Sequence, residues 1–265
     1  MPARTASLVL FLLAAVGGLI WIGEAPRIGP GGLALLGELA AAALQPALWD
    51  SDGRGIFLPA VALEAAGQTV ALAAAAISLA VLGGGLLAPL LSSSVTGRLP
   101  RWLGRPLWLG SRGLAAALRS VHELLWATLL LAALGRSTTA AVLAIGLPFA
   151  GMLARVYAAL LDEADPGPSR ALERAGAGPL AALLLARLPQ ILPDAIAYTL
   201  YRFECALRAS AVLGFFGLPT LGYHIALAAR DVRPPEIWTF LYALLALVLL
   251  TEAWSGAVRR RLVRT

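Results

Sequence analysis

The sequence predicts an all-α, polytopic membrane protein, and three observations lead to this prediction. Hydrophobic residues make up 59% of the 265 residues and charged residues only 14%, whereas soluble domains carry about 25% charged residues. Long stretches contain no charge, as helices that cross the ~30 Å hydrocarbon core of a bilayer require. Arginines gather in a few of the intervening segments, as they do at cytoplasmic membrane flanks. We therefore expect a transmembrane helical bundle of about six spans.

Three charge-free stretches define the most evident spans. Their lengths are 19 residues between Arg4 and Glu24, 33 between Glu64 and Arg98, and 18 between Arg136 and Arg155. A cleaved signal peptide is the alternative for the first stretch, because small residues near Gly23 and Ala25 suit a cleavage site. An uncleaved first helix agrees better with an even number of spans.

Three further spans are expected over residues 114–134, 194–216 and 237–258. The first of them carries Arg119, His122 and Glu123 in its first turns. Two other apolar segments do not read as crossings. Residues 31–48 contain Glu38 and Pro46, which favours a helix lying on the outer surface. Glycines punctuate residues 209–229, so a helix should end near Gly217 and a short re-entrant or external helix should follow.

The arginine distribution predicts the orientation and the division of the chain. Arginines without acidic partners mark the N-terminus, the 92–113 segment, expected to be a loop, and the C-terminal tail, so these parts should face the cytoplasm. The acidic 24–64 segment should lie outside. We accordingly expect a first helix plus an external segment at 1–64, a transmembrane domain at 65–258 and a basic cytoplasmic tail at 259–265.

The residue inventory argues against chemistry carried out by this chain alone. All 21 basic residues are arginine, so the lysine of a phosphate-binding P-loop is absent and any ATP must be hydrolysed by a partner. Cys205 is the single cysteine, and neither His122 nor His224 has metal-site spacing. We expect no catalytic residues, no metal and no cofactor. The basic segment with Trp102 reads as a membrane-interface belt, so no nucleic-acid partner is expected.

The 162–189 loop holds the strongest signal. Pro166, Pro168 and Ser169 are typical of a helix start, and Gly176 and Pro179 of a stop. A short helix is therefore expected over residues 169–175, followed by a second apolar helix that ends at Leu188 and Pro189.

This loop resembles the cytoplasmic loop of binding-protein-dependent ABC importer permeases. Their pattern has an acidic residue and alanine, then glycine, then a Leu-Pro pair, which Ala171, Gly176, Leu188 and Pro189 match. Arg170 stands where that family usually has glutamate, and Glu173 lies one turn later. The resemblance implies that the short helix couples the membrane domain to an ATPase subunit.

Further motifs resemble the phosphonate-type branch of these permeases over about residues 65–228. They are RSVHELLWA at 119–127, DPGP at 165–168, LPQILP at 188–193, YTLYRFE at 198–204 and RASAVLGF at 208–215. The resemblance implies a type I ABC importer permease fold in the bacterial inner membrane. It also implies a permease homodimer with two cytoplasmic ATPase subunits and an extracytoplasmic substrate-binding protein, importing phosphonate or a related phosphorus oxyanion by alternating access.

Charges inside the expected spans are candidates for the pathway, because a central charge costs roughly 2.5–3.5 kcal/mol unless it faces protein or water. Glu204 and Arg208 are four residues apart and can pair, as can Arg119 and Glu123. Arg202 lies about 200° around the helix from Glu204. These residues either join helices through ion pairs, or the arginines among them offer guanidinium groups to a passing anion.

Three alternatives remain open from the sequence. The chain could be a permease of the same class for another small solute. It could be a membrane-embedded enzyme that uses His122, Glu123 and Glu204 as acid-base groups. It could also be a purely structural membrane subunit.

Overall fold

A computed structural model describes residues 2–22 and 31–262, which form helices and, within those ranges, no β-strand beyond an isolated bridge between Trp49 and Phe57. The chain divides into two compact units, Met1–Leu44 and Gln45–Thr265. Parts of two expected segments, residues 24–30 outside and 263–265 in the tail, lie beyond the described ranges.

The first unit contains α1 (Pro2–Ile22) and α2 (Gly32–Ala42). With 11 residues, α2 is about 16 Å long at 1.5 Å per residue. That length is about half of what a crossing needs, so α2 is no transmembrane helix. Its placement on the outer surface stays a prediction.

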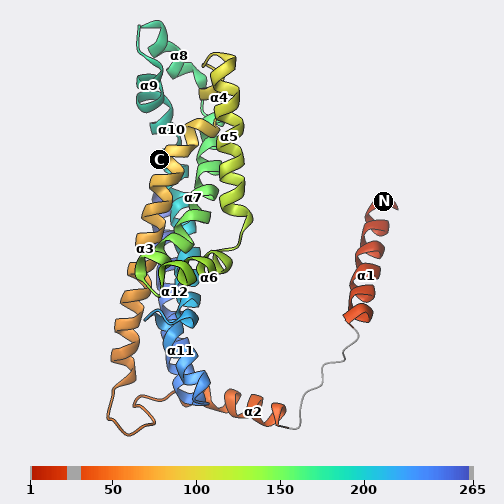
Figure 1. Cartoon of the computed structure of the whole chain (residues 1–265), viewed down its shortest axis with the longest axis vertical. Coiled ribbons are helices and arrows are strands. Elements are labelled where there is room, and N and C mark those ends of the chain that lie inside the picture. Colours follow the sequence, from red (N-terminus) through yellow and green to blue (C-terminus); the bar gives the residue numbers. More distant parts are fainter. Residues whose placement is uncertain (1, 23–30, 263–265) are drawn as a thin grey trace. The chain divides into compact units, whose positions relative to one another are not determined.

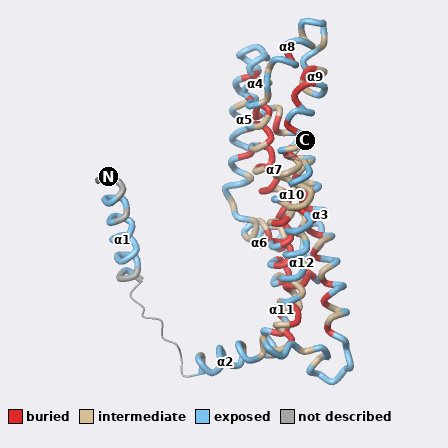
Figure 2. The backbone as a smooth tube through the Cα atoms, turned by 180° about the vertical axis from the view of Figure 1, so that it is seen from behind, coloured by how far each residue is buried: buried red, intermediate tan, exposed pale blue. Residues whose placement is uncertain are grey.

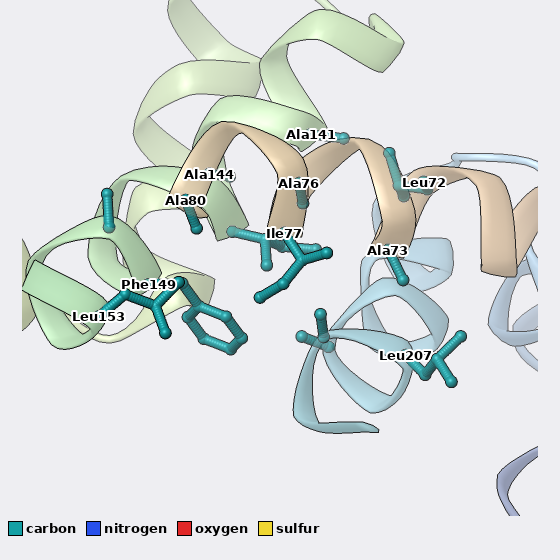
Figure 3. Close-up of a cluster of buried hydrophobic side chains, with 14 of the residues drawn as sticks. Leu72, Ala73, Ala76, Ile77, Ala80, Ala141, Ala144, Phe149, Leu153 and Leu207 are labelled. Atoms are coloured by element: carbon teal, nitrogen blue, oxygen red, sulfur yellow. The ribbon is translucent and has the colours of Figure 1, made fainter. Parts of the chain in front are cut away.

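The core of the second unit is built on α3 (Leu58–Leu91) and α7 (Thr138–Glu163), with α10 (Leu188–Leu213) packed against both. Figure 3 shows the small and branched side chains that α3, α7 and α10 contribute, among them Ala76, Ala144 and Leu207. Glycine brings α3 and α7 together, because a Cβ on Gly84 would lie 2.8 Å from that of Leu153. The small residues let the backbones approach closely, as in many membrane bundles.

The segment between α3 and α7 differs from the expectation. It forms α4 (Ser93–Thr96), α5 (Arg101–Ser120) and α6 (Glu123–Leu134), and α5 and α6 meet at 87°. The expected loop at 92–113 is therefore wrong, and the segment expected to span the membrane at 114–134 is divided by a bend. Val121 is extended, and the His122 side chain accepts a hydrogen bond from the amide of Leu124 at 3.3 Å. This cap starts a new helix in a new direction.

A second correction concerns the helix expected to end at Leu188 and Pro189. α8 (Pro166–Arg174) is followed by α9 (Pro179–Ala182), a π-helical turn η1 (Leu183–Arg187) and then α10 without a break. Pro189 has no amide hydrogen to donate. The wider π turn directly before it changes the hydrogen-bond register, so the helix continues through the proline.

The end of α10 agrees with the expectation. A 3-10 turn η2 (Gly214–Phe216) leads to Gly217, whose φ of +89° favours glycine, and the short α11 (Leu221–Arg230) follows. The last helix, α12 (Pro234–Leu262), contains the expected span at 237–258. Whether α11 is re-entrant or external stays a prediction.

Within the described residues, four helical segments are long and apolar enough to cross a membrane. They are α3, α7, the segment Pro179–Phe216 and α12, and the bent pair α5–α6 would make a fifth. The number of six spans and the cytoplasmic location of both termini stay predictions. Much of α12 is exposed in the single chain (Figure 2).

The two ends of the second unit differ in character (Figure 1). α4, α8 and α9 lie at one end, and α11 lies at the other with the 45–57 segment, whose Ala47 amide bonds the carbonyl of Pro235 at 3.1 Å. α3, the longest helix, extends along most of the distance between these ends.

Candidate functional site

α8 is an exposed helix with well-formed ends. Asp165 caps its start, because its carboxylate accepts the amide hydrogen of Gly167 at 2.9 Å. At its other end the amide of Ala177 bonds the carbonyl of Leu172 at 2.9 Å, and Gly176 has φ +89°. This is a Schellman motif, which needs a left-handed residue. The helix begins at Pro166 rather than at the expected residue 169 because the Asp165 cap and the proline favour an earlier start.

Contacts hold α8 onto the membrane helices. Glu173 forms an ion pair with Arg98, from the segment between α4 and α5. The Gln190 side chain at the start of α10 donates to the Asp165 carbonyl at 3.4 Å. Arg170 and Ala171 are exposed on α8. Glu173, expected as a carboxylate for a partner, is thus already paired within the chain, and the free surface of α8 carries Arg170.

A carboxylate at the end of α7 holds the start of α4. Asp162 accepts hydrogen bonds from the hydroxyls of Ser92 at 2.6 Å and Ser93 at 3.0 Å, and from the amide of Ser94 at 2.9 Å. Arg187, only 6% exposed, donates to the carbonyl of Leu161 at 3.3 Å and to the Ser94 hydroxyl. We call these residues the Asp162 junction. Its only sequence signals are a run of three serines and an arginine among leucines, from which we did not predict it.

The charges inside the spans pair differently from the expectation. Glu204, 8% exposed, bonds Arg259 of α12 at 3.0 Å, while Arg208 is exposed and has no ion pair within the described residues. Arg119 and Glu123 lie on opposite sides of the α5–α6 bend, and Glu123 contacts His122 at 3.5 Å. The expected pairings within single helices are therefore wrong. α10 is instead joined to α12, an interaction that helical spacing does not reveal.

Removing one member of the Glu204–Arg259 pair should destabilise the fold. We expect Arg259→Gln to lower the free energy of unfolding by about 1–3 kcal/mol, because a buried carboxylate loses its partner. Thermal unfolding of the purified chain measures this. Arg260→Gln is the matched control, since Arg260 is exposed and has no ion pair among the described residues. Equal stability of the two variants would contradict the structural role of the pair.

Arg202 is a cation inside a span without an acidic partner among the described residues. Its Nε and Nη2 donate to the Tyr198 hydroxyl at 2.9 and 2.6 Å. Its guanidinium also lies over the rings of Phe149, Tyr198 and Tyr201, at 5.9, 5.1 and 5.4 Å from the centroids. Aromatic faces stabilise a cation without neutralising it. Arg202 therefore has guanidinium donors on α10 that no carboxylate among the described residues occupies.

The opposite end of the second unit is held by a different ionic cluster. Arg233 pairs with Asp52, Asp231 and Glu236, and the Glu236 carboxylate also accepts the amide hydrogen of Ser51 at 2.8 Å. Nearby, burial lowers the pKa of His224, which the charge of Glu64 opposes. His224 stacks on Phe240 with centroids 4.9 Å apart. It is a half-buried side chain that packs against an aromatic ring.

Comparison with known proteins decides the family. Residues 85–264 match the model of the binding-protein-dependent transport system inner membrane component family, which is more than half of the chain. The chain belongs to this family. The match runs from the last two turns of α3 to the end of α12, so it includes α8, the Asp162 junction and the Arg202 site of this permease.

Several relatives carry names from phosphorus oxyanion transport. The permease is 37% identical over 156 residues to a phosphite transport system permease protein, PtxC, of Stutzerimonas stutzeri, covering 58% of this chain and 57% of that protein. It is 34% identical over 153 residues to the phosphate-import permease protein PhnE of Mycolicibacterium smegmatis, covering 58% and 29%. The first match thus spans a little over half of its relative's length.

Solved structures show the same fold. A chain of an amino acid ABC transporter crystallised with histidines matches with a TM-score of 0.62 at 20% identity, over 76% of this chain and 94% of that one. A chain of the MetNI methionine ABC transporter in an inward-facing conformation matches with a TM-score of 0.64 at 19% identity, over 76% and 96%. The expected all-α, type I ABC importer permease fold is confirmed.

Proposed function

We propose that this permease forms the translocation pathway of an ATP-driven importer for phosphonate or a related phosphorus oxyanion. The observation that carries the proposal is the similarity to phosphite and phosphate-import permeases at 34–37% identity. An oxyanion needs cationic donors along its path, and arginine presents a planar fork that suits phosphorus-bound oxygens. Arg202 supplies such a group inside a span, held by aromatic rings rather than by a carboxylate.

The partners in this proposal are two cytoplasmic ABC ATPase subunits, an extracytoplasmic substrate-binding protein and a second copy of the permease. α8 is the element we assign to the ATPase. A helix-in-groove contact is supported because α8 exposes Arg170 and Ala171 and is capped at the left-handed Gly176. We assign Leu188 and Pro189, both exposed, to the same surface. With this assignment the end with α4 and α8 faces the cytoplasm of a bacterial cell, and from the arginine distribution we propose that both termini are cytoplasmic as well.

The proposed cycle is alternating access. The loaded binding protein docks at the α11 end, ATP closes the ATPase subunits, α8 passes that closure to the spans, and hydrolysis resets the inward-open state. Ion pairs hold each end of the second unit, Arg98–Glu173 near α8 and the Arg233 cluster near α11. The division of the chain at residues 1–64, 65–258 and 259–265 belongs to the same proposal.

Transport assays with purified components test the function. The permease, its ATPase and its binding protein are reconstituted in liposomes, and ATP-dependent uptake of methylphosphonate, phosphite, phosphate and methionine is compared. We expect uptake of at least one phosphorus oxyanion and none of methionine. Uptake of methionine alone would favour the importer for another solute. ATP-independent turnover of a substrate by the permease alone would favour the membrane-embedded enzyme.

Arg202 gives a specific prediction within this assay. Arg202→Gln should reduce oxyanion uptake by about tenfold or more, because a charge-assisted contact worth about 1.5–3 kcal/mol is lost. Arg208→Gln is the matched control on the same helix, since Arg208 is exposed and has no ion pair within the described residues. A larger loss from Arg208→Gln than from Arg202→Gln would assign the cargo contact to Arg208 instead.

A further inference from the structure

A cavity of about 300 Å³ between α5 and α7 is lined by three arginines. Arg112 and Arg119 come from α5 and Arg155 comes from α7, while alanines of both helices form much of the remaining wall. Asp162 and Glu163 also line it. All three arginines are exposed, so the cavity is open to a ligand from outside the bundle.

Helix packing shows which charges face one another. α5 and α7 run in opposite directions, with Ala115 buried in one cluster with Ala154 and Ala158. A Cβ on Gly151 would lie 3.0 Å from that of Leu118, so Arg119 lies close to the level of Gly151. Arg155 is four residues after Gly151, about 6 Å further along α7. Arg112 is seven residues before Arg119, about 10 Å along the helix. This register places Arg112 nearest to the carboxylates, Arg119 furthest from them and Arg155 at a level between the two.

The carboxylates leave Arg119 and Arg155 without a counterion. The Asp162 oxygens accept their hydrogen bonds from Ser92, Ser93 and Ser94. Within the described residues neither Arg119 nor Arg155 has a carboxylate within 4.0 Å. Two like charges on facing helices repel each other. An anion bound between them removes that repulsion.

We propose that this cavity binds one phosphate-type group, with Arg119 and Arg155 bridging its oxygens and Arg112 as a third donor. Guanidinium forks match tetrahedral phosphorus oxyanions. The group has two sources with the same chemistry, a free oxyanion and the headgroup of an anionic phospholipid, for which basic pockets between membrane helices are suited. The proposal concerns binding alone, so it stands independently of the cargo proposed above.

Binding to the purified full-length permease tests this inference. Inorganic phosphate is titrated calorimetrically, and retention of phosphatidylglycerol is measured by native mass spectrometry. The Arg119→Gln/Arg155→Gln variant should weaken binding of one of these probes by about ten- to hundredfold, the cost of lost charge-assisted hydrogen bonds. Loss for inorganic phosphate identifies a free oxyanion site, and loss for phosphatidylglycerol alone identifies a lipid site.

Two further variants keep the test decisive. Arg105→Gln is the matched control, because Arg105 is an exposed arginine of α5 that does not line the cavity. Ala159→Leu fills the cavity without removing a charge, and it should also weaken binding. It therefore supplies the test if the double variant does not fold. Binding of neither probe to the unmodified permease, or equal binding by all variants, would overturn the proposal.

Discussion

Replacing Gly176 by proline is expected to reduce uptake by more than about tenfold while the chain still folds. Gly176 has φ +89° and its amide bonds the Glu173 carbonyl at 3.0 Å. Proline fixes φ near −65° and has no amide hydrogen, so the cap of α8 is lost at a cost of about 3 kcal/mol or more. Only α8 and its connection should change, because nothing lies within 4 Å of a Cβ at this position. ATP hydrolysis should continue without transport.

The control for this experiment is two residues away. Gly178 also has open space around it, but its φ of −68° suits any residue. Gly178→Ala should therefore leave uptake unchanged, whereas Gly176→Ala should cause an intermediate loss, because a left-handed alanine costs about 1–2 kcal/mol. Uptake is measured in proteoliposomes together with ATPase activity. Normal coupled uptake by Gly176→Pro would remove α8 from the proposed mechanism.

Replacing Gly222 by alanine is expected to give the largest loss of stability. The added Cβ would lie 1.8 Å from the carbonyl oxygen of Ala211, where α11 meets α10. The obstacle is backbone rather than a flexible side chain, so the α10–α11 corner must open. We expect the free energy of unfolding to fall by about 3 kcal/mol, the upper end of overpacking effects.

Thermal unfolding and the yield of monodisperse protein measure this effect. Gly113→Ala in α5 is the matched control, because nothing lies within 4 Å of a Cβ there. That substitution should be neutral or slightly stabilising, since alanine favours helix. A Gly222→Ala variant as stable as Gly113→Ala would show that the corner yields without cost.

Features that depend on local sequence were predictable. Charge-free length located the hydrophobic helices α3 and α7, and the proline and glycine pattern located the short helix α8 and the break at Gly217. Motif order identified the family without reference to structure. These features succeed because helix starts, stops and apolar length are decided by neighbouring residues.

Features that depend on tertiary contacts were not predictable. Helical spacing suggested that Glu204 pairs with Arg208, but Arg259 reaches it from a helix 55 residues later in the chain. The bend after Ser120 depends on the cap formed by the His122 side chain, and the sequence around it looks like that of an ordinary span. The cavity with Arg119 and Arg155 needs the register of α5 against α7. A single sequence gives periodicity, and it does not say which helices are neighbours.

The Asp162 junction has a consequence for how force spreads through the bundle. The Asp162 carboxylate, at the end of α7, accepts a hydrogen bond from the turn that ends α3. Arg187 attaches the turn that leads into α10 to the same place. A force on α8 would therefore be transmitted to α3, α7 and α10 at the end where they meet. The three helices would then tilt together rather than one at a time.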